Sequence, residues 1–371
     1  MKDSVEILLA GDLVLDEPDA SHWLSGIAPA LQMADLAIGH LEVPHGQGAE
    51  LLGDVPAPAA PLENLAAIRE AGFDLLSMAG NHIADCGAEG IAQTISELDR
   101  LSIGHSGAGQ TLGEARKPAI MACRNRRVAL LSYNCVGPEA AWATGTRAGC
   151  AWLRVDTADG APIAPAAALD RMSADVPAIL ASDIVSARKS ADLVLVALHK
   201  GIVHTPARLA PYERPIAHAA IDAGADVVLA HHAHIVRGIE FYQDRPIFHG
   251  LGNGCVVTRA LSSAQDHPAR REWAERRKRL FGFEPDPAYT LAPFHPEAIN
   301  AMLGRLSWHA DGRIEAGIMP VHIEPPGRPV MAEGARAKEI MRYIADITVA
   351  ADLPPIMIDE AGWVQPGGER A

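Results

Sequence analysis

The sequence predicts an α/β fold in which helices cover the faces of a mainly parallel sheet. Apolar segments that suit buried strands alternate with amphipathic segments that suit helices through residues 5–100. Polar residues directly follow each apolar segment, beginning with Gly11 and Asp12 after the segment Val5 to Ala10. Strands that alternate with helices pair in parallel through right-handed crossovers, so these polar residues should gather at one edge of the sheet.

Three strands and three helices are expected in the first part of the chain. The segment Gln47 to Pro61 is rich in Gly, Ala and Pro and predicts a loop. Ile91, Ile95 and Leu98 recur at helical spacing and would line the buried face of the third helix. The expected strands are residues 5–10, 36–39 and 73–78, and the expected helices are residues 23–33, 61–71 and a segment around 91–98.

The second part of the chain adds a hairpin, two helix–strand units and an antiparallel pair. The hairpin is expected over residues 119–123 and 127–133, and the strands at 301–308 and 313–323 join at Asp311 and Gly312. A final helix is expected from Gly334 to Ala350, followed by a loose tail rich in Pro and Gly. The two helix–strand units are residues 172–190 with 193–198, and residues 215–223 with 227–230.

Length and composition indicate one large globular domain with an appendage. The 371 residues are 49% hydrophobic and 21% charged, which is typical of a folded chain with a sizeable core. Residues 1–330 are expected to form one domain with variable insertions at about 137–167 and 260–300, and residues 331–371 a C-terminal helix and tail. Within the second insertion, Asp266 to Arg279 predicts a charged helix, either a solvated surface or a cap facing the substrate.

Charge and cysteine usage narrow the class of partner and the compartment. The net charge of −14 disfavours nucleic acid or an anionic membrane surface as a partner. The five cysteines are odd in number and widely spaced, which does not suit a disulfide framework. The first residues enter a strand without the pattern of a signal peptide, and no apolar run approaches transmembrane length. These features predict a cytoplasmic protein.

Histidine and carboxylate residues follow the expected strands at five places. The strand Val227 to Ala230 ends in His231, His232 and His234, and alternate residues such as His232 and His234 can face one metal ion together. A solvated turn is the alternative for a single run of histidines, but five such strand ends favour a common site. Nitrogen and oxygen donors without thiolate suit a divalent ion used in Lewis-acid chemistry or hydrolysis. The other strand ends supply Asp12, His40 with Glu42, Asn81 with His82, and His199.

Several of these motifs together resemble a known family. Gly11-Asp12, GHLE at Gly39 to Glu42, GNHIADCG at Gly80 to Gly87, His199 and the segment AHHAHIVRGIEFY with PIFHGLGN resemble the CapA, or poly-γ-glutamate capsule-type, branch of the calcineurin-like metallophosphoesterases. The resemblance implies a four-layer α/β/β/α sandwich with one or two divalent ions, Ca, Mn or Zn. It also implies a set of metal ligands: Asp12, Glu42, Asn81, His82, His199, His232 and His234.

Two departures from the family pattern bear on the reaction. His40 stands where the family usually has Asn, and the capsule members are exported or membrane-anchored. The chain is similar in this respect to cytoplasmic members that epimerise lasso-type precursor peptides. Inverting an α-carbon needs a base and an acid on opposite faces, for which the candidates are Asp12, His40, His231 and His295.

Two other functions stay open at the level of the sequence. The same metal could activate water to hydrolyse a phosphoester or a γ-glutamyl amide bond. A metal-stabilised binding protein is a further alternative. The expected partner is a peptide or a small anionic substrate, and the sequence predicts no oligomeric state.

Overall fold

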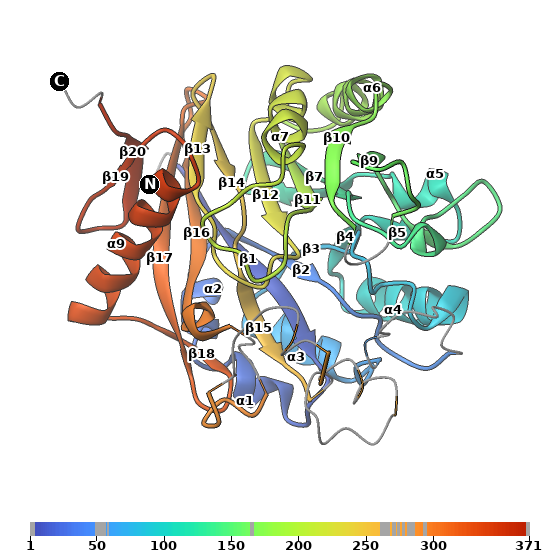
Figure 1. Cartoon of the computed structure of the whole chain (residues 1–371), viewed down its shortest axis with the longest axis horizontal. Helices are drawn as coiled ribbons and strands as arrows, with labels where there is room; N and C mark the ends of the chain where they lie inside the picture. Colours follow the sequence, from blue (N-terminus) through green and yellow to red (C-terminus); the bar gives the residue numbers. More distant parts are fainter. Residues whose placement is uncertain are drawn as a thin grey trace.

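Two β-sheets packed face to face form the centre of the molecule (Figure 1). The computed structural model describes residues 4–48, 57, 59–163, 167–259, 286–291 and 295–368, together with 268, 272, 275, 276 and 279. The charged helix expected at residues 266–279 therefore lies largely outside the described residues.

The larger sheet is mixed and has ten strands. Its order is β19-β20-β17-β16-β1-β2-β3-β4, with β15 also paired to β1 and β18 to β17. The strands β1 to β4 and β15 pair in parallel, whereas β16 to β20 pair antiparallel. Their bounds are β1 Val5–Leu15, β2 Leu36–Leu41, β3 Leu75–Ser77, β4 Gly104–Ser106, β15 Asn253–Val257, β16 Asn300–Trp308, β17 Ile314–Glu324, β18 Arg328–Met331, β19 Ile356–Ile358 and β20 Trp363–Pro366.

The second sheet has six strands in the order β13-β14-β12-β11-β7-β6. The strands β7, β11, β12 and β14 run parallel, and β6 and β13 close the two edges antiparallel. Their bounds are β6 Ala119–Cys123, β7 Arg126–Asn134, β11 Leu193–His199, β12 Val227–His231, β13 Ile239–Tyr242 and β14 Arg245–Phe248.

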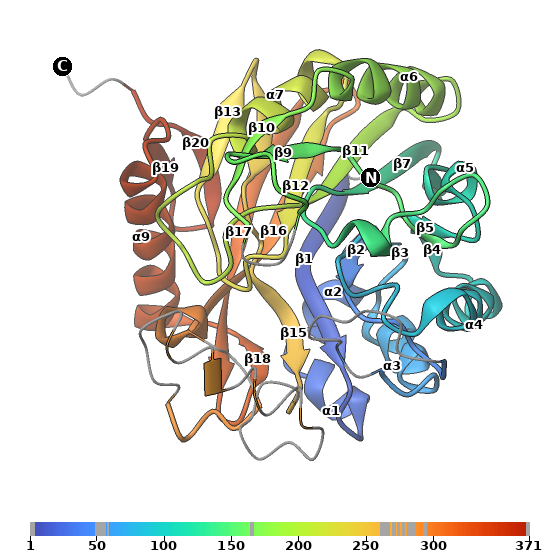
Figure 2. The ribbon, with the colours of Figure 1, turned by 45° about the vertical axis from the view of Figure 1, so that its right-hand side comes forward.

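Helices cover the outer faces of both sheets, which gives four layers (Figure 2). Side chains of β1 alternate between two cores: Leu8 and Leu13 pack toward the helices, whereas Ile7 and Leu9 pack between the sheets. The four-layer α/β/β/α sandwich is therefore confirmed. The larger sheet is covered by α1 Ala20–Leu24, α2 Ala28–Gln32, α3 Asn64–Ala71 and α4 Gly87–Arg100, and the smaller by α6 Val176–Arg188 and α7 Glu213–Asp222.

Two expectations about local structure are wrong. The strand expected to end at Ala10 continues to Leu15, because β15 pairs with its second half and a register shift at Asp12 accommodates the polar residue. The helix expected over residues 23–33 is two short helices, α1 and α2. They separate at Gly26, where a Cβ would overlap the backbone of Pro329.

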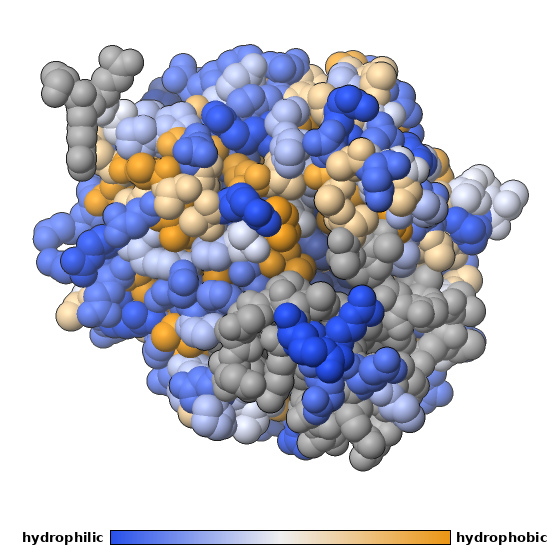
Figure 3. All heavy atoms as spheres, in the orientation of Figure 1, coloured by the Kyte–Doolittle hydropathy of each residue, from blue (hydrophilic) through white to orange (hydrophobic). Residues whose placement is uncertain are grey.

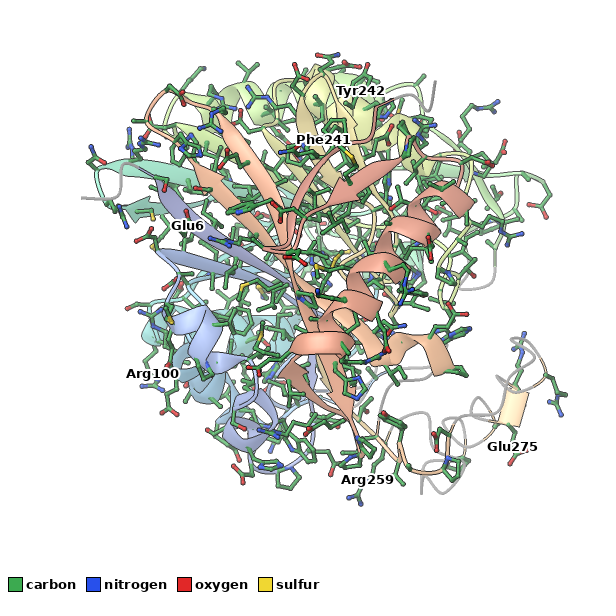
Figure 4. All side chains as sticks on the ribbon, turned by 90° about the vertical axis from the view of Figure 1, so that its left-hand side faces the viewer. Glu6, Arg100, Phe241, Tyr242, Arg259 and Glu275 are labelled. Atoms are coloured by element: carbon green, nitrogen blue, oxygen red, sulfur yellow. The ribbon has the colours of Figure 1, made fainter. Side chains whose placement is uncertain are left out.

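The C-terminal segment is ordered, contrary to the loose tail expected from its composition. The helix α9, Gly334–Ala350, places Ile340 and Ile344 in the core between the sheets (Figure 4). The hairpin β19–β20 then pairs with β17 and extends the larger sheet. Ile356 and Val364 supply the apolar face that holds the hairpin on the core.

The first insertion starts beside a strand that carries a site residue. Cys135, directly after β7, donates a backbone hydrogen bond to His199 at the end of β11. Trp142 and Trp152 of the insertion stack with ring centroids 4.5 Å apart. The insertion contains η1 Glu139–Ala141, β8 Gly149–Cys150 and β9 Val155–Thr157, and β10 Leu169–Met172 follows it. The elements α5 Leu112–Ala115 and β5 Ala108–Gly109 precede the insertion in the chain and contact β8.

The surface is polar and charged, as the composition predicts. The face in Figure 3 carries hydrophilic residues interspersed with smaller apolar areas. Among the residues that the structure describes, the large hydrophobic side chains that are exposed lie on separate segments, and Met33, at 88% exposed, is the most accessible of them. Scattered exposed apolar residues of this kind are ordinary on a folded chain.

Candidate metal centre

The two sheets bring five site-bearing strands together. In the larger sheet, Asp12 of β1 lies in register with His40 of β2 on one side and Asn253 of β15 on the other. In the smaller sheet, His199 ends β11 in register with His231, which ends β12. The strands β1 and β12 contact each other across the sandwich. Residues from distant parts of the sequence therefore share one buried volume.

The first group in this volume contains two carboxylates joined by one imidazole. Asp12 and Glu42 are 0% and 1% exposed. His234 lies between them, with Nδ1 3.5 Å from Oδ2 of Asp12 and Nε2 3.2 Å from Oε1 of Glu42. Nδ1 of His234 also lies 3.0 Å from Oδ1 of Asn253, which orients the ring.

The second group is a stack of imidazoles. The ring of His40 lies parallel to that of His231 at 4.5 Å and tilted against that of His199 at 4.7 Å. Nδ1 of His40 lies 2.8 Å from the hydroxyl of Ser77. Nε2 of His231 donates to the carbonyl of Ala10 at 3.3 Å. His40 and His231 are thus each fixed through one ring nitrogen, and the other nitrogen of each is buried without a hydrogen-bond partner among the described residues.

Asn81 and His232 extend the stack toward the surface. Oδ1 of Asn81 lies 2.7 Å from Nε2 of His199, and Nδ1 of His232 lies 3.1 Å from the same nitrogen. His232 and His234 have φ of 91° and 53°, in the left-handed region that non-glycine residues seldom adopt. Such strained conformations gather at functional sites, where the surroundings enforce them.

His82 belongs to a different kind of pair. Its Nδ1 lies 2.8 Å from Oδ2 of Asp85, whose side chain is only 1% exposed. The His82 side chain keeps 26% of its surface accessible. Asp85 also accepts a hydrogen bond from the backbone amide of Ala57, so its carboxylate is held in place by a second contact besides the imidazole. The pair places a protonatable group at the margin of the centre.

Burial and mutual repulsion keep the stacked imidazoles neutral. Burial, followed by the neighbouring imidazoles, holds the pKa of His40 and of His199 well below the ordinary value. Burial lowers the pKa of His231 to about 4, and burial with the nearby His234 lowers that of His232 to about 3. Neutral imidazoles are the form that binds a metal ion or accepts a proton.

Two imidazoles in the centre have the opposite tendency. Burial disfavours the charge on His234, but the carboxylates of Glu42 and Asp12 outweigh it and raise its pKa to about 9. His234 in turn lowers the pKa of Glu42 to about 2 against the effect of burial, while burial and Glu42 raise the pKa of Asp12. Asp85 raises the pKa of His82 above its ordinary value despite burial.

The donors that face one another fit a divalent cation. Among the residues that the structure describes, buried polar atoms of Asp12, Glu42, His40, His199 and Asn253 have no hydrogen-bond partner. Buried polar groups are normally satisfied, so a cluster of such atoms marks the place of a further ligand. Donor atoms of two sets lie within 4.8 Å of one another: Asp12 with His40 and His199, and Asp12 with Glu42 and His234. Asp12 belongs to both.

The two donor sets include some of the predicted site residues and leave others out. Asp12, Glu42, His199 and His234, predicted as metal ligands, lie in them, and so does His40, which was predicted as an acid–base group. The predicted ligands Asn81, His82 and His232 lie beside the sets and contact other residues, and His231 stacks on His40.

His295 lies outside both sets. Its ring caps the short helix η2, Pro296–Ile299, where Nδ1 accepts a hydrogen bond from the backbone of Glu297 at 3.1 Å. Ala298 of this helix packs on Ala233 and Ile235, which flank His234. His295 therefore lies beside an element that packs against the segment that carries His234.

Three residues near the centre were not predicted as site residues. Asn253 orients His234, Asp85 pairs with His82, and the ring of His204 lies 6.1 Å from that of His234. Asn253 ends the motif PIFHGLGN and Asp85 lies within GNHIADCG, so the motifs contained both signals. His204 gives no such signal, because its loop is brought to the site by tertiary contacts such as the hydrogen bond that its backbone amide donates to the carbonyl of Ala233.

The fold and the site together define a class of protein: an α/β/β/α sandwich with a candidate metal centre of nitrogen and oxygen donors supplied by both sheets. The family model described as bacterial capsule synthesis protein PGA_cap matches residues 6–256. The chain belongs to this family. The match contains each residue of the centre and ends at β15.

Curated relatives agree with this assignment over part of their length. The chain is 28% identical to the capsule biosynthesis protein CapA of Bacillus anthracis over 53% of this chain and 43% of that protein. It is 28% identical to the PGA biosynthesis protein CapA of Bacillus subtilis over 55% of this chain and 50% of that protein. A probable polyglutamine synthesis accessory protein of Mycobacterium tuberculosis is 29% identical over 52% and 47%. The chain spans about half the length of the curated relatives it matches.

The solved structures that resemble this chain share less of its sequence than the curated relatives do. The calcineurin-like phosphoesterase YfkN of Bacillus subtilis aligns with 94% of this chain and 98% of its own at a TM-score of 0.37 and 12% identity. GAP50 of Plasmodium aligns at a TM-score of 0.39 and 9% identity, over 99% of this chain and 100% of its own. Within the part of the chain that the structure describes, no helix has the length and hydropathy needed to cross a membrane.

Proposed function

We propose that this chain is a metal-dependent acid–base enzyme that acts on a peptide substrate. The observation that carries the proposal is that one site contains two kinds of imidazole: a buried one that is kept neutral and one that is paired with a carboxylate. His40 keeps a buried nitrogen without a hydrogen bond among the described residues, whereas His82 is held by Asp85 as a proton carrier. A base and an acid thus stand on different elements of one site.

The metal would be held by four residues of the two donor sets, which leaves His40 as a proposed base. Asp12, Glu42, His199 and His234 supply oxygen and nitrogen atoms of the kind that Mn²⁺ and Zn²⁺ accept, and Ca²⁺ would favour the carboxylates. When bound, a divalent cation supplies a Lewis acid for a carbonyl oxygen. The proposal includes one or two such ions, because Asp12 belongs to both sets.

The reaction we propose is inversion of an α-carbon in a ribosomal precursor peptide of the lasso type. One group removes the α-proton and a second group returns a proton to the opposite face, so no bond of the chain is broken. His40 and His231 are the proposed bases within the stack, with Asp12 orienting the group nearest the substrate. His295 and His82 are proposed on the acid side, because both lie at the margin of the centre. We also propose that the protein acts in the cytoplasm, as the sequence predicts.

Hydrolysis is the second candidate, and membership in the capsule synthesis family favours it. The relatives are named for capsule and PGA biosynthesis, which suggests a γ-glutamyl amide as the bond cleaved. A phosphoester is the other bond that the same centre could cleave. In this reaction a neutral imidazole would accept the proton of attacking water and His82 would protonate the leaving group.

Incubation in deuterium oxide separates the two reactions. Precursor peptides encoded near the gene, γ-glutamyl oligomers and a generic phosphodiester are each treated with the Mn²⁺-loaded protein. The proposal predicts one deuterium at one α-carbon, the same final mixture of epimers from a peptide of either configuration, and no fragment. Cleavage of an amide or phosphoester without α-deuteration would replace epimerisation by hydrolysis. Metal binding without either reaction would indicate a metal-stabilised binding protein.

The variant His40→Asn provides a matched comparison. It restores the residue that the family usually carries at this position and removes the proposed base. Epimerisation should fall by about 10²-fold or more, because a general base contributes on that order. A hydrolytic activity would persist in the same variant.

A further inference from the structure

A cluster of buried charged residues lies directly behind the metal centre. We call it the buried ion cluster: Lys200, Glu213, Arg237, Glu240 and His249. Four of these side chains are 0% exposed and Glu240 is 2% exposed, although none is part of either donor set. Residues with charged side chains are seldom buried to this extent unless their partners hold them.

Hydrogen bonds join the five side chains into one chain of contacts. Nζ of Lys200 donates to Oε2 of Glu213 at 2.9 Å and lies 3.2 Å from Nδ1 of His249. Nη1 of Arg237 donates to both oxygens of Glu213, at 3.0 and 2.8 Å. Nε2 of His249 donates to Oε2 of Glu240 at 2.9 Å. His249 therefore links the Lys200–Glu213–Arg237 half to Glu240.

Glu240 connects the cluster to the surface. Arg214 and His218 of α7 contact it at 2.5 and 3.0 Å, and their side chains are 38% and 23% exposed. The inner half of the cluster has no such access to solvent. Changing His249 to an apolar residue would consequently leave Lys200 paired with Glu213, and Glu240 paired with residues of α7.

Three of the site-bearing segments each contribute a member of the cluster. Lys200 directly follows His199, Arg237 follows His234 by three residues, and His249 precedes Asn253 by four. The backbone amide of Arg237 donates to the carbonyl of Gly250, which ties two of these loops together. Three segments that provide or orient metal donors are thus fastened to one set of ion pairs.

Two glycines indicate how closely the loops are fitted to the cluster. Gly201 has φ of 116°, and a Cβ there would overlap Nη1 of Arg237. A Cβ at Gly250 would lie 2.9 Å from Cγ of Arg237. The backbone of both loops therefore approaches the Arg237 side chain more closely than any other residue type allows.

We propose that the buried ion cluster positions the donors of the metal centre, and that His249 is the residue that couples its two halves. Removing charged groups from water is unfavourable, and apolar side chains of similar volume are often at least as stabilising. Stability alone therefore does not account for the cluster. Fixed spacing of three metal-bearing loops is what its contacts provide. This inference rests on the proposed metal site but not on the reaction performed there.

The test compares metal affinity in three variants by calorimetric titration with Mn²⁺. His249→Leu cuts the link and should lower the affinity about 10-fold, the effect of losing support around metal ligands. His249→Gln can still accept from Lys200 and donate to Glu240 through its amide, so it should recover most of the affinity. Tyr133→Phe is the control, because it removes a part-buried hydrogen bond from β7 of the same sheet to Asp183 of α6 without touching the cluster.

Co²⁺ provides a second readout, because its visible spectrum reports coordination geometry. The spectrum should change in His249→Leu and stay as in wild type in Tyr133→Phe. Circular dichroism and a cooperative thermal transition establish that each variant is folded. A folded His249→Leu protein with wild-type affinity and spectrum would overturn the inference, and so would equal losses in His249→Leu and Tyr133→Phe. A wild-type protein that binds neither ion would overturn the metal site and this inference together, whereas metal binding without epimerisation would leave this inference intact.

Discussion

His234 is the residue on which the charge of the centre depends. It contacts both buried carboxylates and orients its ring through Asn253. A cation between Asp12 and Glu42 would take over the charge that His234 carries, since an imidazole binds metal in its neutral form. The protonated imidazole and the metal ion are therefore alternatives at one place.

Metal affinity should consequently depend on pH. The pKa of His234 is raised to about 9, so below this pH the incoming ion must displace a proton. Affinity should rise about tenfold for each pH unit toward pH 9 and then level off. Titration calorimetry in buffers of different ionisation enthalpy measures the released proton. His234→Gln should bind weakly and without this dependence, and a flat wild-type profile from pH 6 to 9 would contradict the assignment.

His82 should act as an acid only because Asp85 holds its proton. Asp85 raises the pKa of His82, so Asp85→Asn should lower it. If His82 supplies a proton in turnover, the alkaline limb of the pH–rate profile will move to lower pH in this variant. Proton NMR of the His82 ring measures the same shift without turnover. The Asp99→Asn variant is the control, because Asp99 contacts His105 at 3.1 Å in an exposed pair away from the centre. An unchanged His82 titration in Asp85→Asn would exclude this role.

At the scale of elements, the C-terminal hairpin is part of the folded domain. Ile356 is 8% exposed and belongs to the core between the sheets, whereas Met357 on the same strand is 56% exposed. Ile356→Ala should lower the free energy of unfolding by about 2 kcal/mol or more, because it removes buried methylene groups.

Met357→Ala is the matched control on β19, because its side chain faces solvent. It should change the free energy of unfolding by less than about 0.5 kcal/mol. Urea denaturation followed by circular dichroism measures both variants. Equal, small effects of the two substitutions would mean that the hairpin adds nothing to the core.

Comparing the strands with the sequence patterns shows which parts of the fold could be predicted from the sequence alone. Apolar periodicity located the parallel strands β1, β2, β11 and β12, because each is a short apolar segment that ends in polar residues. The second half of β1 was missed, because its pairing with β15 depends on contacts distant in the chain. The hairpin β19–β20 was missed for the same reason, and its Pro and Gly content suggested a loop instead.

The candidate site follows the same division. Residues within strand-end motifs, such as Asp12, His199 and His234, could be proposed as ligands from sequence. Which imidazole pairs with which carboxylate could not, because that depends on how the two sheets face each other. His40 enters a donor set and His82 turns to Asp85 for this reason. The buried ion cluster was not predicted. Arg237, Glu240 and His249 lie within the motifs that follow β12, but the sequence does not show that their side chains are buried together, because their pairing depends on how the loops pack.

At the scale of the whole molecule, two sheets and three loops enclose one group of donors that lack partners among the described residues. The four-layer arrangement explains why the centre is buried, since each sheet presents site residues to the interior of the sandwich. The division into residues 1–330 and 331–371 stays a prediction, and α9 packs its apolar face on the shared core.

The central claim is that these donors hold a divalent cation, and metal analysis tests it most directly. Protein purified without chelator, then supplied with Mn²⁺ or Zn²⁺ and dialysed, is measured by inductively coupled plasma mass spectrometry beside the Asp12→Asn variant. The account predicts at least about one ion for each wild-type chain and a raised melting temperature on loading, because a ligand that binds only the folded state stabilises it. Asp12→Asn should lose the ion and keep its fold, since Asp12 belongs to both donor sets. Wild-type protein that retains no metal and gains no stability from any of the ions, or Asp12→Asn protein that binds them equally well, would contradict the account.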